Sequence, residues 1–230
     1  MRIRFLTLTS LAGSLLLAMA GLAPAGAAVP DDCAVPPDID LSAYNVIIGT
    51  DASERLVGTS GPDFICGLLG DDMIDAGGGN DLILADTTTF FGNFEARGGN
   101  DRVLAGPGDD EVLPGPGDDR VGGGSGDDFI ALALGDDWAS GGLGADSIIG
   151  GFGVDRISAG PQDDFIAGGP GDDFLLGGPG ADFLAGELPP PPPGTEPPPL
   201  PGGPSLNDRC IGASGFDIAV DCDTVVSIEG

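Results

Sequence analysis

The chain has 230 residues, of which 43 are glycine and 21 are proline, and its formal net charge is −29. Such a charge excludes direct binding to nucleic acid or to an anionic membrane surface. The chain has no histidine, which excludes Ser-His and Cys-His catalytic pairs and zinc-peptidase motifs, so we expect no enzyme, although a glycosidase needs only two carboxylates.

The first 28 residues have the features of a secretory signal peptide. Arg2 and Arg4 form a basic start, residues 5–23 are apolar, and the small residues Gly26 and Ala28 fit cleavage after Ala28. Cleavage after Ala27 is the near alternative, and an uncleaved membrane anchor is the other. We predict a released, extracellular protein with no membrane span after cleavage.

Residues 29–44 form a short acidic lead, and a nine-residue period fills residues 45–187. Within each repeat an aspartate is sixth, an aliphatic residue is eighth, and glycine is usual at the second and fourth positions. The sixth-position aspartates are Asp63, Asp72, Asp81, Asp101, Asp110, Asp119, Asp128, Asp137, Asp146, Asp155, Asp164, Asp173 and Asp182. A fixed short period indicates one small unit stacked on copies of itself.

The composition of the repeat predicts how each unit folds. Glycines at the second and fourth positions favour a turn, and the last three residues favour a short strand with one inward aliphatic side chain. Two repeats then make one coil, and aspartates eighteen residues apart become neighbours about 4.8 Å apart along one edge. The predicted fold class is all-β, a parallel β-roll (a β-helix or solenoid).

The repeat reads G-G-x-G-x-D-x-U-x, where U is aliphatic, and it resembles the haemolysin-type (RTX) calcium-binding repeats. The resemblance implies that Ca2+ lies between successive turns, held by the thirteen aspartates and by turn carbonyls. Oxygen-rich turns suit calcium, which takes six to eight oxygen ligands. A metal-free solenoid with solvated aspartates is the alternative, but it does not explain thirteen carboxylates in one phase.

Three places depart from the pattern. Twenty residues separate Asp81 from Asp101, two more than two repeats, which predicts a bulged coil that lacks an aspartate and a calcium site. Glycines are missing at residues 132–133 and at Gln162, which puts the local sites in doubt. Ala139 is small for an inward position, so we expect a packing gap or a shift of its coil.

Residues 188–204 are rich in proline and read as a stiff linker, and residues 205–230 read as a C-terminal cap, which solenoids require. Four cysteines in an exported protein predict two disulfides with three possible connectivities. The simplest is Cys33–Cys66 and Cys210–Cys222, one at each end. The I-C-G-L turn at residues 65–68, typical of the repeat proteins that the chain resembles, favours this pairing.

These features predict a secreted calcium-binding repeat protein that folds on calcium. An extracellular structural or adhesive module, in which calcium is only a scaffold, is the alternative, and a carbohydrate-active enzyme is the less favoured one. Outward aromatic side chains at the seventh position form either a patch for self-association or a shield over the sheet; these are Trp138, Phe165, Phe174 and Phe183. Calcium is the only partner that the sequence identifies.

Overall fold

A computed structural model describes residues 33, 35, 39–86, 98–186, 209–212, 218–220, 222 and 224–227. The predicted signal peptide and the proline-rich linker lie outside the described residues, as do half of the lead and parts of the cap. Among the described residues, no helix combines the length and the hydropathy needed to span a bilayer.

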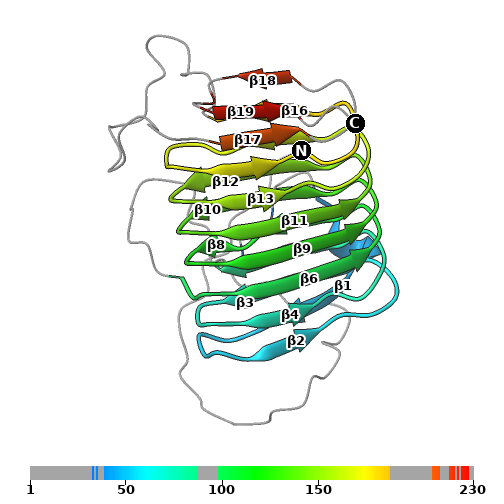
Figure 1. Ribbon diagram of the computed structural model, residues 1–230. Coiled ribbons are helices and arrows are strands. Elements are labelled where there is room, and N and C mark those ends of the chain that lie inside the picture. The colour runs from blue at the N-terminus through cyan, green and yellow to red at the C-terminus, as the bar shows by residue number, and fades with distance from the viewer. Residues whose placement is uncertain are drawn as a thin grey trace, which may run out of the picture.

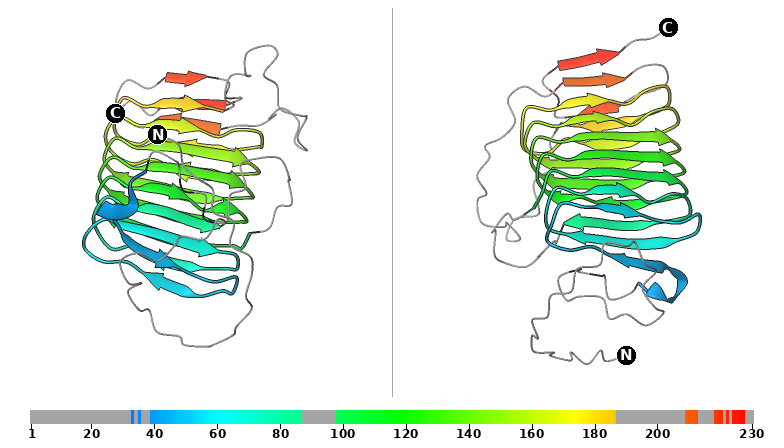
Figure 2. Two further views of the ribbon diagram at one scale, coloured as in Figure 1. Left: turned by 180° about the vertical axis from the view of Figure 1, so that it is seen from behind. Right: turned by 90° about the horizontal axis from the view of Figure 1, so that it is seen from below.

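The described chain winds into two parallel sheets, and successive strands alternate between them, except that β7 and β8 both lie in sheet A (Figure 1). The strands of sheet A are β1 (Asn45–Ile48), β3 (Asp63–Leu68), β5 (Leu82–Asp86), β7 (Glu111–Leu113), β8 (Gly115–Pro116), β10 (Phe129–Leu134), β12 (Ser147–Phe152), β14 (Phe165–Ala167), β16 (Phe183–Ala185) and β18 (Ile218–Val220). The strands of sheet B are β2 (Arg55–Val57), β4 (Met73–Asp75), β6 (Arg102–Pro107), β9 (Arg120–Ser125), β11 (Trp138–Leu143), β13 (Arg156–Ser158), β15 (Phe174–Leu176), β17 (Arg209–Gly212) and β19 (Thr224–Ser227). A short 3-10 helix, η1 (Leu41–Ala43), precedes β1. The prediction of an all-β parallel roll is confirmed, and Figure 2 shows the stack from behind and from below.

The register between neighbouring strands is eighteen residues over most of the roll. Phe129 pairs with Ser147, and Ser147 pairs with Phe165. Two repeats therefore make one coil, as the glycine and aspartate pattern predicted.

The register of the strands on either side of the irregular segment after Asp81 differs from the prediction. Met73 pairs with Arg102 and Leu82 pairs with Glu111, a register of 29 residues on both sheets. Since 29 is 18 plus 11, one repeat carries an eleven-residue insertion, and the stack continues across it without a break. The prediction of a missing aspartate is wrong, because Asp101 takes the next place after Asp72. The predicted bulge falls on residues 87–97, which lie outside the described residues.

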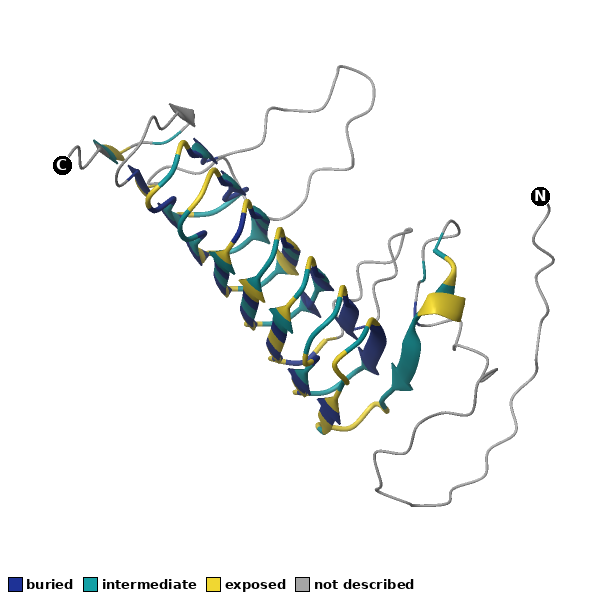
Figure 3. Cartoon of the chain, turned by 90° about the vertical axis from the view of Figure 1, so that its right-hand side faces the viewer, coloured by how far each residue is buried: buried dark blue, intermediate teal, exposed yellow. Residues whose placement is uncertain are grey.

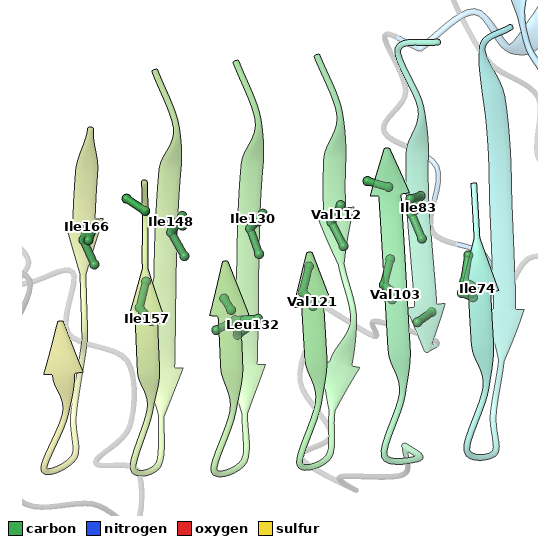
Figure 4. Packing of buried hydrophobic residues seen from close by; sticks show 14 of the residues in the cluster. Ile74, Ile83, Val103, Val112, Val121, Ile130, Leu132, Ile148, Ile157 and Ile166 are labelled. Atoms are coloured by element: carbon green, nitrogen blue, oxygen red, sulfur yellow. The ribbon is translucent and has the colours of Figure 1, made fainter. Parts of the chain in front are cut away.

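The core is a column of aliphatic side chains between the two sheets (Figure 4), and Figure 3 shows that buried residues recur along the roll. Every eighth-position residue from Ile65 to Leu184 is at most 1% exposed; these are Ile65, Ile74, Ile83, Val103, Val112, Val121, Ile130, Ala139, Ile148, Ile157, Ile166, Leu175 and Leu184. Five first-position residues, Ala76, Ala85, Ala105, Leu132 and Ala159, belong to the same cluster. Each repeat thus contributes only one or two side chains to a thin core, which leaves the turns to stabilise the rest of the coil.

Ala139 does not shift its coil, which stays in register with its neighbours on both sides. Leu132 takes the first position of the same repeat, is fully buried and belongs to the same core cluster. Figure 4 shows Leu132 directed into the space between the sheets. The large residue at one position supplies the volume that the small residue at the other lacks.

Both predicted disulfides are present. The Cys33–Cys66 bond spans 33 residues and the Cys210–Cys222 bond spans 12. The first fixes the lead over the outer surface of sheet A, where Phe64 and Leu82 become buried in a second apolar cluster. The second lies in the cap, where β17, β18 and β19 extend the two sheets.

Candidate metal centre

The turns owe their shape to residues with a left-handed backbone. In the repeat of Asp128, Gly124 has φ 125° and Gly126 has φ 128°, values that glycine adopts without steric cost. Where glycine is missing, the turn persists, because Ala133 (φ 85°) and Gln162 (φ 88°) adopt the same region. These two repeats therefore keep the turn geometry that the sequence put in doubt.

The sixth-position aspartates form two buried ladders, one along each edge of the roll. All thirteen are at most 3% exposed. In each ladder one carboxylate oxygen, Oδ1, accepts a hydrogen bond from the backbone N–H of the preceding aspartate, as in Asp110 N to Asp128 Oδ1 (2.9 Å) and Asp119 N to Asp137 Oδ1 (2.8 Å).

The ladders run through the insertion. Asp72 N donates to Asp101 Oδ1 (2.7 Å), and Asp81 N donates to Asp110 Oδ1 (2.8 Å). Among the described residues the two ladders contain eleven such aspartate pairs. Pairing the aspartates that are eighteen residues apart in the sequence gives only nine pairs, because it does not cross the insertion.

The second carboxylate oxygen, Oδ2, is buried and has no hydrogen-bond partner in ten of these aspartates. They are Asp72, Asp81, Asp101, Asp110, Asp119, Asp128, Asp137, Asp146, Asp155 and Asp164. An ionised oxygen that is buried without a partner is costly. Ten of them in one phase indicate that a cation belongs beside them.

Backbone carbonyls converge on the same places. A Cβ added to Gly123 would overlap both Asp128 Oδ2 and the carbonyl oxygen of Gly141 in the next coil. Five other repeats show the same arrangement: the aspartate Oδ2 comes from five residues after the first glycine of the repeat, and the carbonyl oxygen comes from eighteen residues after it. These glycines are Gly58, Gly67, Gly141, Gly150 and Gly168. No group of three or more acidic, histidine or cysteine side chains gathers at one point in the described part of the chain. Each cradle instead pairs a carboxylate with carbonyl oxygens, a donor set that suits calcium.

Burial also changes the acidity of the ladder. Burial, with a smaller contribution from the neighbouring carboxylates, raises the pKa of Asp128 to about 7 and that of Asp137 to about 8. The backbone hydrogen bond acts in the opposite direction but is the weaker effect. A bound dication would favour the charged form and reverse this shift.

Asp63 differs from the other predicted site residues. Its Oδ1 accepts a hydrogen bond from Asn45 Nδ2 (2.6 Å), and its Oδ2 accepts one from Thr59 N (2.5 Å). Both oxygens are already satisfied by protein groups, so Asp63 has the least to gain from a cation.

The sequence prediction missed a third set of polar side chains, at the fifth position. Asp127 N donates to Asp109 Oδ1 and Asp136 N donates to Asp118 Oδ1, both at 3.0 Å. These ladders are exposed and run opposite to the buried ones, since each side chain caps the following coil. The signal was present as the repeated Asp-Asp dipeptide.

Asp86 was missed as well. It takes the second position of its repeat, where glycine is usual, and it is completely buried at the end of β5. No periodic pattern singles it out.

Comparison with known families now adds to this geometry. Four copies of the RTX calcium-binding nonapeptide repeat match residues 48–83, 95–130, 133–166 and 158–188, which is more than half of the chain. The chain belongs to the RTX calcium-binding nonapeptide repeat family. RTX repeats bind Ca2+, and the buried aspartate ladders fit that role. A comparison with curated proteins finds no match.

Proposed function

We propose that this RTX protein is a secreted calcium-binding β-roll whose thirteen sixth-position aspartates hold Ca2+ between successive turns and whose folding depends on that binding. The buried Oδ2 atoms without partners are the observation that carries the proposal, and in the repeats of Asp72, Asp128, Asp146 and Asp155 a turn carbonyl lies beside the same place. When bound, calcium supplies two positive charges at the point where those oxygens converge. The chain supplies the carboxylates, the carbonyls and the spacing.

The cost of the metal-free ladder supports coupling between binding and folding. Two unit charges about 5 Å apart repel by roughly 0.8 kcal/mol even at the dielectric constant of water, and each interior aspartate has two such neighbours. A chain with 43 glycines also loses much conformational entropy on folding. Metal binding contributes directly to folding in such systems.

An oxidising compartment fits both the disulfides and the N-terminal sequence. Disulfides are typical of exported proteins, and the chain forms two of them in the described residues. The domain organisation that goes with this location is a signal peptide (1–28), a lead (29–44), the roll (45–187), a linker (188–204) and a cap (205–230). We expect no catalytic activity, because the periodic carboxylates serve the array.

The test is a far-UV circular dichroism titration of the mature chain with calcium, starting in chelator. We expect little β-structure in chelator and a cooperative gain at calcium concentrations on the order of 0.1–1 mM, the range of extracellular modules. Magnesium, which requires a stricter octahedron, should produce a smaller gain at equal concentration. A β-rich spectrum in chelator that calcium leaves unchanged would refute the proposal.

A further inference from the structure

Asp86 is a buried carboxylate that no repeat pattern requires. Its Oδ2 accepts a hydrogen bond from Gly99 N (3.0 Å), and its Oδ1 is buried with no partner. In other turns the same N–H donates to a carbonyl of the next coil, as Gly117 N does to Leu134 O and Gly126 N does to Leu143 O. The carboxylate of Asp86 therefore enters the turn that ends in Asp101 and replaces a backbone partner there.

The surroundings of Asp86 are those of one aspartate ladder. A Cβ added to Gly98 would overlap both Asp86 Oδ2 and the carbonyl oxygen of Pro116, the same carboxylate-and-carbonyl arrangement as in the other cradles. Burial, together with the charge of the nearby Asp101, raises the pKa of Asp86 to about 8. A glycine at this position would carry no charge. The turn that bears the insertion thus places a second carboxylate beside the ladder.

We propose that Asp86 and Asp101 together form a calcium site with two carboxylates, which fills at a lower calcium concentration than the other sites of the roll. The proposal rests on the proposed function, since it assumes that the ladder binds calcium. The number of charged ligands is one of the factors that set calcium affinity. A tight site beside the insertion would give the stack a place from which to grow in both directions.

Isothermal titration calorimetry of the full mature chain tests this site. We expect wild type to show a tight class of about one ion ahead of the main cooperative phase. Asp86→Asn should remove that class, weakening its affinity about tenfold, and should leave the main phase. Asp109→Asn, at an exposed fifth position, is the matched control and should keep the tight class.

A second variant guards against misfolding. Asp86→Gly restores the residue that is usual at this position, so it should fold in saturating calcium, as circular dichroism would show, and still lack the tight class. A tight class that survives in Asp86→Gly overturns the two-carboxylate site while the ladder stands. No calcium uptake by wild type at all overturns the proposed function itself.

A separate observation concerns the outer surface of sheet B, which we call the arginine face. Its row of paired seventh-position residues reads Arg55, Met73, Arg102, Arg120, Trp138, Arg156, Phe174 and Arg209. All five arginines are exposed, and Trp138 is 47% exposed. The equivalent row of sheet A has no arginine and reads Phe64, Leu82, Glu111, Phe129, Ser147, Phe165 and Phe183.

The arginine face has the composition of a protein-binding surface. Arginine, methionine and aromatic residues are enriched in interfaces, whereas lysine and acidic residues are depleted. Within the described residues, the one ion pair of the row joins Arg55 to Asp75 (3.3 Å), and Arg209 lies over the ring of Phe174 (5.6 Å). The three central arginines have no acidic partner there.

A matching surface exists on the same molecule. The exposed fifth-position residues on the turns that enter sheet A form an acidic edge that reads, coil by coil, Asp109, Asp127, Ala145, Asp163 and Ala181. At the same coil levels the arginine face reads Arg102, Arg120, Trp138, Arg156 and Phe174. Acid stands level with arginine, and alanine stands level with an aromatic ring. Both rows share the strand spacing of about 4.8 Å.

We infer that the arginine face binds the acidic edge of a second copy of this chain, with the two rolls side by side and parallel. Calcium would enable this contact, because it folds the roll and offsets much of the net charge of −29 that otherwise keeps copies apart. A contact between two different surfaces does not close in a pair, so it leads to rings or to open lateral arrays.

Sedimentation velocity in calcium tests the contact. Wild type should form assemblies larger than a dimer at low salt and should dissociate at high salt. Arg120→Glu with Arg156→Glu should remain monomeric, as should Asp127→Arg with Asp163→Arg. The chain that carries all four changes should assemble again. Ser147→Arg, on the equivalent row of sheet A, is the control and should assemble like wild type.

Two outcomes would overturn this inference. In the first, the wild-type protein stays monomeric in calcium at all protein concentrations, even if its arginine face binds an acidic polysaccharide instead. The other is assembly that persists in both charge-reversal pairs. Circular dichroism in calcium verifies that each variant folds before it is compared.

Discussion

Replacement of one interior ladder aspartate should change the stability of the roll in opposite directions with and without calcium. Asp128→Asn keeps an oxygen to accept the hydrogen bond from Asp110 N but removes the charge. Without calcium, the lost charge relieves repulsion from two neighbours, Asp110 and Asp146, which is worth roughly 2 kcal/mol at the dielectric constant of water. The pKa of about 7, against an ordinary value of 3.8, sets an upper figure of about 4 kcal/mol. The metal-free fold should therefore gain about 2–4 kcal/mol.

With calcium the same change should destabilise the fold. Asp128 lies between two candidate sites, one shared with each neighbour in the ladder. A site at a free calcium concentration of 100 Kd contributes about 2.7 kcal/mol, so losing both costs about 5 kcal/mol. The net loss is about 1–3 kcal/mol after the gain without metal is subtracted. A plot of stability against the logarithm of calcium concentration should have a lower slope for the variant and should cross that of wild type.

Circular dichroism can follow both limits. In chelator the fold is populated with trimethylamine N-oxide, which strengthens effective burial, and the variant should need less of it. In calcium the fold is unfolded with urea. Asp63→Asn is the control, because the carboxylate of Asp63 is already satisfied by Thr59 and Asn45, and it should change both limits less. If Asp128→Asn destabilises the fold equally with and without calcium, Asp128 is only a hydrogen-bond acceptor.

Three further predictions concern protons, ions and packing. Burial raises the folded-state pKa of Asp72, Asp128 and Asp164 to about 7, so the metal-free fold binds more protons than the unfolded chain between about pH 4 and pH 7. The stability of the metal-free fold should therefore fall as pH rises through that window, and circular dichroism in chelator should show more β-structure at pH 5 than at pH 8. Calcium affinity should rise with pH. Calorimetry should find at most about one ion for each of the eleven aspartate pairs, and fewer than about four ions per chain would contradict a continuous metal array. In urea unfolding with calcium, Leu132→Ala should lower the free energy of unfolding by about 3 kcal/mol, and Ala139→Ile should lower it by about 1–3 kcal/mol. The double variant should recover most of both losses. Additive losses would mean that the two side chains do not share one space.

The sequence predicted the features that recur in every repeat. Each aliphatic eighth position and each aspartate sixth position lies where the period places it, because a strand of fixed length after a turn of fixed length leaves no other direction for the side chain. The disulfide pairing was predicted on other grounds, as the simplest of three connectivities, with one bond at each end, and it was favoured by the I-C-G-L turn at residues 65–68 that is typical of the repeat proteins that the chain resembles.

Features that depend on a single coil were not predictable in this way. Counting in nines cannot distinguish two repeats and two extra residues from one repeat and an eleven-residue insertion, and only the pairing of Met73 with Arg102 separates them. The compensation between Leu132 and Ala139 was missed because a pattern treats each position independently, whereas packing joins two positions of one repeat. Asp86 was missed because no other repeat has an aspartate at its second position.

The same thin core explains why calcium binding would control folding, and would not merely add ions to a fold that is already stable. One or two buried aliphatic side chains per nine residues are a small apolar contribution against the entropy of a glycine-rich turn. Most of the remaining contacts are backbone hydrogen bonds between coils, which form only when the next coil is already in place. Each ladder aspartate strengthens this dependence, since it caps the preceding coil through Oδ1 and repels it through Oδ2 until a cation arrives. Cooperativity along the stack therefore follows from the position of one carboxylate, repeated thirteen times.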